Sequence, residues 1–184
     1  MARTYSLLLI GFGNVGQAFA RLLLRKEQLL EEEFGCKFRV TGIATGRHGR
    51  ALDAAGINLA RALELANAGQ SLDLLAAQPA PTDMAEFIYT ASADVLFENT
   101  PVNHHSGQPA AQYLRLGLEK GMHAITANKG PVVHAYPELT ALAAQRGRRF
   151  LFESAVMDGA PIFSLFRGPL PAAEVTGFQG ILNS

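Results

Sequence analysis

The sequence lacks several features that characterise common classes of protein. Its 184 residues include one cysteine, Cys36, so no internal disulfide can form, which fits a reducing compartment. The 16 Lys and Arg residues are balanced by 16 Asp and Glu residues, so the chain has no basic field to attract nucleic acid. The apolar run Leu7 to Ile10 is too short for a signal peptide or a membrane span. We therefore expect a cytoplasmic protein that partners neither nucleic acid nor membrane.

The composition is typical of a folded globular domain. Hydrophobic residues make up 48% of the chain and charged residues 17%, which excludes disorder as the main state. A chain of this length buries roughly 70% of its unfolded surface on folding. We therefore expect a hydrophobic core that needs neither a disulfide nor a metal ion for its stability.

Apolar segments alternate with amphipathic segments along most of the chain. Strands are expected where short apolar or β-branched runs end at polar or turn-forming residues, at 5–10, 38–44, 93–98, 123–126 and 149–153. Helices are expected where apolar residues recur at helical spacing, at 15–33, 83–90, 109–120 and 138–146, with further short helices between 51 and 77. Repeated strand and helix units predict an α/β fold with a doubly wound parallel sheet.

The segment Gly11-Phe12-Gly13-Asn14-Val15-Gly16 lies directly between an apolar strand and an amphipathic helix. This context is the one that a dinucleotide-binding fingerprint requires. Gly11 permits a tight turn, Gly13 lets the backbone approach a pyrophosphate, and Gly16 allows the helix to pack closely on the strand. Amides at the start of a helix attract anionic oxygens. The motif predicts a dinucleotide site at residues 11–16; the alternative is a glycine-rich turn without a ligand.

The end of the second predicted strand bears on the choice between NAD and NADP. NAD-binding proteins place an acidic side chain there, where it binds the ribose 2′-hydroxyl. Here the stretch from Ala44 to Arg50 contains no acidic residue and offers Thr45, Arg47 and Arg50 instead. Guanidinium groups suit a 2′-phosphate. We therefore expect NADP to be preferred over NAD; the alternative is a solvated basic loop.

Further motifs accompany the glycine motif in a fixed order. They are Glu98-Asn99-Thr100-Pro101, Thr126-Ala127-Asn128-Lys129-Gly130-Pro131, Glu153-Ser154-Ala155-Val156 with Gly159 and Pro161, and the closing Gly180-Ile181-Leu182-Asn183-Ser184. In this combination the chain resembles homoserine dehydrogenase over essentially its whole length. The resemblance implies an NAD(P)-dependent oxidoreductase of threonine, isoleucine and methionine biosynthesis, which interconverts aspartate 4-semialdehyde and homoserine.

The resemblance also implies roles for residues that match the family's motifs. Lys129 matches a lysine beside the nicotinamide and the substrate, and it is assigned to catalysis together with Glu153. Asn99 and Thr100 match the stretch beside the nicotinamide. A monovalent cation is expected on four backbone carbonyls, although residues 157 and 158 are larger than is usual there. These carbonyls belong to Glu153, Val156, Asp158 and Ala160.

Position alone leaves the roles of three charged residues open. Lys129 follows a strand on the carboxyl side of the sheet, where it can polarise a carbonyl or donate a proton, but a surface lysine at a helix entrance has the same position. Glu98 ends its strand either as a polar contact of the cofactor pocket or as a strand cap. Glu153 needs a partner if it is buried, because burial of a lone carboxylate is costly.

The chain divides into two parts at about residue 160. Residues 1–160 form the expected NAD(P)-binding domain. Residues 161–184 hold a turn-rich connection and a predicted strand at 174–182, which the resemblance identifies as the start of an α+β catalytic and dimerisation domain. The family's substrate-binding aspartate and second lysine lie beyond this point. The resemblance also implies that the full-length protein is a homodimer. The alternatives are another amino-acid or semialdehyde dehydrogenase and a non-catalytic dinucleotide-binding module.

Overall fold

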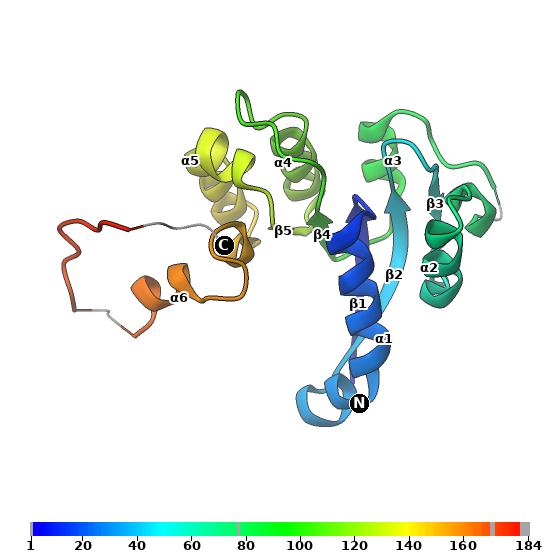
Figure 1. Ribbon diagram of the computed structural model, residues 1–184, viewed down its shortest axis with the longest axis horizontal. Helices are drawn as coiled ribbons and strands as arrows, with labels where there is room; N and C mark the ends of the chain where they lie inside the picture. The colour runs from blue at the N-terminus through cyan, green and yellow to red at the C-terminus, as the bar shows by residue number, and fades with distance from the viewer. Residues whose placement is uncertain (1, 77, 170–171, 181–184) are drawn as a thin grey trace.

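A computed structural model describes residues 2–76, 78–169 and 172–180, and its centre is a six-stranded sheet (Figure 1). The strands lie in the order β3-β2-β1-β4-β5-β6. They are β1 (Arg3–Ile10), β2 (Cys36–Ala44), β3 (Arg50–Leu52), β4 (Val95–Glu98), β5 (His123–Thr126) and β6 (Phe150–Leu151). The chain order reverses between β1 and β4, which is the topology that places a ligand at the carboxyl ends of these two strands.

Five of the six strands run parallel, as predicted, whereas β3 pairs antiparallel with β2 at one edge. The sequence predicts short helices between residues 51 and 77, and for residues 51 and 52, which belong to β3, that prediction is wrong. Gly49 adopts a left-handed φ of 77° and reverses the chain shortly after β2 ends. Residues 50–52 therefore fold back onto residues 42–44.

The helices cover both faces of the sheet. Helices α1 (Asn14–Phe34) and α2 (Leu59–Asn67) pack on one face, against a buried cluster that includes Leu7 and Leu9. Helices α3 (Met84–Thr90), α4 (Ala110–Lys120) and α5 (Lys129–Gln145) pack on the other, against Leu8 and Ile10. Among the described residues, no helix is both long and apolar enough to cross a bilayer. Side chains that alternate between two buried faces confirm the doubly wound α/β fold.

Helix α5 begins well before the predicted start. The prediction places its start at Glu138, whereas the observed helix begins at Lys129 and contains Pro137 in its interior. In the structure Asn128 caps the helix, and its side-chain oxygen accepts the N–H of Gly130 at 2.9 Å. This cap places Lys129 at the first helical position, beside the carboxyl end of β5.

The chain after α5 departs most from the prediction. The strand expected at 149–153 shrinks to the two residues of β6, because residues 153–155 form a 3₁₀ turn. A short helix, α6 (Ile162–Arg167), follows. Residues 172–180 form neither helix nor strand and are exposed (orange to red in Figure 1), so the strand expected at 174–182 is not formed in its described part. A strand needs a neighbour for pairing, and the described sheet ends at β6; residues 181–184 of the closing motif lie outside the described residues.

Candidate cofactor-binding site

A cavity of ≈ 1160 Å³ opens at the carboxyl ends of β1, β2 and β4. Its walls come from the glycine loop, the turn after β2, the loop after β4 and the start of α4. Among the described residues that line it, none is acidic. The volume suits a large, dinucleotide-sized ligand. The predicted cofactor residues on its walls are Gly11, Phe12, Gly13, Asn14, Val15, Thr45, Arg47, Arg50, Asn99 and Thr100.

The three glycines of the loop after β1 serve different purposes. Gly11 has a φ of +98°, and a Cβ on it would lie 2.5 Å from the carbonyl oxygen of Asn99. A Cβ on Gly16 would lie 2.6 Å from the carbonyl oxygen of Gly11. A Cβ on Gly13 would have no atom within 4 Å. The protein's own packing therefore requires the first and third glycines, whereas the second leaves open space in front of the helix.

The start of α1 presents unpaired amide groups to this space. Gly13 is the N-cap residue, no side chain caps the helix, and its first turn contains no acidic residue. The first hydrogen bond of the helix runs from the N–H of Gln17 to the carbonyl of Gly13, at 2.9 Å. The N–H groups of Asn14, Val15 and Gly16 precede it and have no partner within the helix. Together with the helix dipole, these donors favour an anion such as a pyrophosphate.

The turn after β2, residues 45–50, forms what we call the arginine end of the cavity. The hydroxyl of Thr45 accepts the N–H of His48 at 2.7 Å and donates to the carbonyl of Gly49 at 2.9 Å. These bonds close a tight turn that leaves Arg47 exposed on the cavity wall. The predicted Thr45 thus shapes the turn, while Arg47 offers an exposed guanidinium.

Arg50 lies on the same wall but is already engaged by the protein. Its guanidinium donates to the carbonyls of Pro81 and Thr82, at 3.1 and 2.6 Å, and lies 5.9 Å from the ring centroid of Phe87. Its backbone N–H donates to the carboxylate of Asp73 at 2.7 Å. Arg50 therefore ties β3 to the segment that precedes α3, and of the two predicted arginines it has the less freedom to turn toward a ligand.

Glu98 at the end of β4, the loop residues 99–100, Thr126 and Asn128 form what we call the carboxylate end of the cavity. Glu98 is fully buried at 0% exposure. One of its carboxylate oxygens accepts the N–H and the hydroxyl of Thr100, at 2.7 and 2.5 Å, and the other accepts the hydroxyl of Thr126 at 2.6 Å. Glu98 therefore caps the end of its strand, which is one of the two alternatives left open by the sequence. Because its partner Thr100 lines the cavity, the same hydrogen bonds also support the cavity wall.

Asn128 extends this network to the start of α5. Its N–H donates to the Thr126 hydroxyl at 2.9 Å, and its side-chain amide donates to the carbonyl of Thr100 at 3.2 Å. Lys129 follows as a half-buried residue that forms no ion pair with any described residue. It lies next to the cavity at the carboxyl side of the sheet but is not one of the residues that line it.

Glu153 is not one of the residues that line the cavity. Its carboxylate accepts the hydroxyl and the N–H of Ser164, at 2.7 and 3.1 Å, at the start of α6. The Ser164 hydroxyl is the first cause that holds the pKa of Glu153 below its usual value, and partial desolvation opposes it. The structure therefore gives Glu153 the partner that the sequence analysis required, but places it in a local cap rather than beside the cofactor loop.

The predicted cation site is only partly open. Of its four backbone carbonyls, that of Ala160 accepts the N–H of Ile162 at 2.8 Å. Met157 and Asp158, the two larger residues in this segment, have left-handed φ values of 56° and 49°. Within the described part of the chain, no three His, Cys, Asp or Glu side chains gather as a metal site. The carbonyl set stays a prediction, and no step below depends on a cation.

Several residues that sequence analysis did not single out also line the cavity, including Gln17, Met84, Gln108 and Tyr113. Burial is the main cause that raises the pKa of Tyr113, the positive charge of Arg50 opposes it, and the negative charge of Glu98 adds to it. None of these residues belongs to a motif. Helical periodicity could have placed Tyr113 on the inner face of α4, but not at a ligand.

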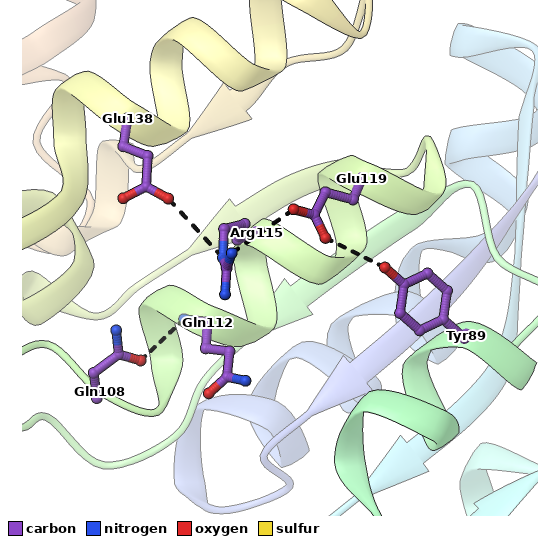
Figure 2. A network of polar contacts seen from close by, with 6 residues as sticks. All are labelled: Tyr89, Gln108, Gln112, Arg115, Glu119 and Glu138. Atoms are coloured by element: carbon purple, nitrogen blue, oxygen red, sulfur yellow. Dashed lines mark hydrogen bonds and ion pairs between the residues drawn. The ribbon is translucent and has the colours of Figure 1, made fainter.

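A surface network of polar contacts links α4 to the neighbouring helices (Figure 2). Arg115 pairs with Glu119 and with Glu138 of α5, both at 3.9 Å, and the hydroxyl of Tyr89 on α3 donates to Glu119 at 3.2 Å. Gln108 accepts the N–H of Gln112 at 3.2 Å and so caps α4. The network links α3, α4 and α5 on the face opposite α1.

Comparison with known proteins agrees with this site. Residues 11–153 match the family model of the homoserine dehydrogenase NAD-binding domain. The NAD(+)-dependent homoserine dehydrogenase of Pseudomonas canavaninivorans is 35% identical over 97% of this chain and 51% of its own length. The homoserine dehydrogenase of Methanocaldococcus jannaschii is 30% identical over 96% and 52%.

Solved structures give the same result. A hyperthermophilic archaeal homoserine dehydrogenase mutant in complex with NADPH superposes with a TM-score of 0.77 at 27% identity, over 91% of this chain and 49% of that one. A homoserine dehydrogenase from Thiobacillus denitrificans gives 0.68 at 25% identity, over 93% and 34%. The chain thus spans about half the length of the curated relatives it matches. Its glycine loop, its sheet and these matches show that it belongs to the family of homoserine dehydrogenase NAD-binding domains.

Proposed function

We propose that this chain is the cofactor-binding part of a homoserine dehydrogenase, which prefers NADP and interconverts aspartate 4-semialdehyde and homoserine. The observation that carries the proposal is the open amino terminus of α1. Gly13 leaves room there, the first amides of the helix are unpaired, and the cavity in front of them is lined by no acidic residue among those described. A pyrophosphate fits this combination, because it is large and anionic.

The strand order supports the orientation of the cofactor. With the pyrophosphate at α1, one half of a dinucleotide extends over β2 and the other over β4. The arginine end lies over β2 and offers Thr45 and Arg47, so the adenosine ribose belongs there. The nicotinamide belongs at the carboxylate end, beside Asn99, Thr100 and the start of α5.

The charge of the arginine end supports NADP over NAD. An acidic side chain that would bind a ribose 2′-hydroxyl is missing from the described lining, and the guanidinium of Arg47 can pair with a 2′-phosphate. The names of relatives point in both directions, because one is called NAD(+)-dependent and another was solved with NADPH. The preference therefore rests on the residues of this chain.

Lys129 is the residue of this chain that we place in the reaction. A bound nicotinamide cofactor supplies or accepts the hydride. The ammonium of Lys129 would orient the carbonyl of aspartate 4-semialdehyde, stabilise its oxygen as charge develops, and hold the proton of the alcohol. Groups that bind the rest of the substrate, and the contacts of a homodimer, are expected from the other half of the full-length protein. We place that protein in the cytoplasm.

Titration of this chain with NADPH and with NADH, followed by nicotinamide fluorescence at one salt concentration, tests the cofactor proposal. Saturable binding of both with tighter binding of NADPH is the expected result, because only NADPH carries the 2′-phosphate. Equal affinities would remove the NADP preference. Absence of binding of either cofactor would overturn the proposed function of the cavity.

Steady-state turnover of the full-length protein tests the catalytic proposal. Lys129→Ala should reduce kcat for homoserine by at least about a thousandfold, because it removes a charge from the reacting centre. NADPH affinity should stay within about threefold, since Lys129 is not part of the cavity lining. Lys26→Ala, a change on the exposed face of α1, is the matched control. Retained turnover in Lys129→Ala would exclude the role, and turnover of another semialdehyde alone would correct the substrate.

A further inference from the structure

The carboxylate end of the cavity contains a negative charge that the proposed reaction does not use. Glu98 is 0% exposed, and no described residue forms an ion pair with it. Three donors converge on its two oxygens, from the N–H of Thr100 and the hydroxyls of Thr100 and Thr126. This is the pattern that an ionised carboxylate requires, and the hydrogen bonds satisfy it without cancelling its charge.

Glu98 lies next to the part of the cavity wall where we expect the nicotinamide. Glu98 is the last residue of β4 and is flanked in the sheet by Ile10 of β1 and Thr126 of β5. The residues that follow it, Asn99 and Thr100, form the cavity wall at this end. The carboxylate is therefore hydrogen-bonded directly to Thr100, a residue that lines the space where the nicotinamide ring belongs.

The field of Glu98 reaches the cavity. Tyr113 lines the cavity on α4; burial is the first cause that raises its pKa, the positive charge of Arg50 lowers it, and the negative charge of Glu98 raises it. Attraction between charges is stronger where less water lies between them. A ligand cation in the cavity would therefore be attracted to Glu98.

We propose that Glu98 selects the oxidised form of the cofactor, because its buried negative charge attracts the cationic nicotinamide ring of NADP⁺ and not the neutral ring of NADPH. This inference rests on the proposed cofactor function. By thermodynamic linkage, any difference between the two affinities shifts the redox equilibrium of the bound cofactor by the same factor. Glu98 is in this account a residue that acts through its charge and touches neither substrate nor cofactor.

The test is the ratio of two dissociation constants, measured for NADP⁺ and NADPH with this chain and with Glu98→Gln. Glutamine has the same shape and removes the charge. We expect NADP⁺ to bind about tenfold more weakly to the variant, whereas NADPH affinity changes by less than about threefold. An equal loss for both forms would show that Glu98 has only a structural role. Binding of neither form to the unaltered chain would instead overturn the proposed function.

Two controls separate charge from structure. Thr126→Ser keeps the hydroxyl donor and the carboxylate and removes only a methyl group, so the ratio of the two dissociation constants should stay constant. Glu138→Gln makes the same chemical change on the exposed surface network and should leave both affinities unchanged (Figure 2). If Glu98→Gln does not fold, the dissociation constants of NADP⁺ and NADPH for the unaltered chain test the proposal. Weaker binding of NADP⁺ than of NADPH would contradict it.

Discussion

At the glycine loop and the arginine end of the cavity the protein presents backbone amides and cations, whereas at the carboxylate end it presents side chains hydrogen-bonded around a buried anion. The first end depends on glycines and on a tight turn, because the ligand must come close to the backbone. The second depends on hydrogen bonds among Glu98, Thr100, Thr126 and Asn128. The two ends therefore have opposite charge, as do the phosphates and the oxidised ring that we expect them to hold.

The contact between Gly11 and Asn99 joins the two ends, and its disruption should have the largest effect. Gly11→Ala forces a left-handed φ and brings a Cβ to 2.5 Å from the Asn99 carbonyl. We expect a loss of more than about 3 kcal/mol in the free energy of unfolding, together with the loss of NADPH binding. Urea unfolding and fluorescence titration measure both. A stable variant that binds NADPH would contradict the close packing described here.

Gly13→Ala should separate binding from folding. The φ of Gly13 is −78°, which alanine accepts, and no protein atom lies within 4 Å of the added Cβ. We expect the free energy of unfolding to change by less than about 1 kcal/mol. NADPH affinity should fall at least about thirtyfold, because the methyl group occupies the space of the pyrophosphate. Unchanged affinity would show that this space is not where the ligand binds.

Arg47→Glu should sharpen the role of the arginine end. The reversed charge repels a 2′-phosphate, so NADPH should bind about tenfold more weakly while NADH binding changes little. Arg50→Ala is the informative comparison, because the guanidinium of Arg50 donates hydrogen bonds to the carbonyls of Pro81 and Thr82. Its loss should weaken NADPH and NADH alike. If Arg47→Glu affects both cofactors equally, the assignment of the 2′-phosphate to this turn is wrong.

The smallest expected effect concerns Asp73, whose carboxylate accepts the backbone N–H of Arg50 at the arginine end. The N–H of Arg50 is the first cause that lowers the pKa of Asp73, and the hydroxyl of Ser71 is the second. Because the pKa is lower in the folded state, the carboxylate stabilises the fold above about pH 4, its unfolded value, and this contribution is lost as the pH falls further.

Asp73→Asn should accordingly reduce the free energy of unfolding at pH 7 by under about 1 kcal/mol, since the side chain is exposed and screened. Urea unfolding at pH 7 and pH 3 checks the sign. The difference between Asp73→Asn and the unaltered chain should shrink at pH 3. A difference that grows in acid would mean that Asp73 does not act as a carboxylate.

The same contrast explains what could be predicted from the sequence. The five parallel strands, the main helices and the glycine loop follow from local patterns, namely hydrophobic periodicity and the motif from Gly11 to Gly16, whereas the antiparallel strand β3 does not. The carboxylate end depends on residues 28 positions apart, Glu98 with Thr126 and Thr100 with Asn128, which only the pairing of β4 with β5 brings together. Local reasoning could name Glu98 but could not choose its role.

Contacts between distant parts of the chain add what local patterns do not show. Pro137 lies inside α5, where the Asn128 cap and the packing of the helix on the sheet accommodate it. Two predicted site residues also have distant partners: the guanidinium of Arg50 donates to the segment that precedes α3, and Glu153 accepts hydrogen bonds from Ser164 of α6. Their roles in binding and catalysis stay predictions.

The most direct test of the central claim, that one cavity holds the two halves of the cofactor at ends of opposite charge, is a map of backbone amide shifts by NMR. NADPH should shift the amides of residues 13–16, 46–48 and 99–100 together, and leave those of α6 unchanged. Adenosine 2′,5′-bisphosphate should shift only the first two groups. Shifts elsewhere, or a bisphosphate that perturbs residues 99–100 and not 46–48, would contradict the account.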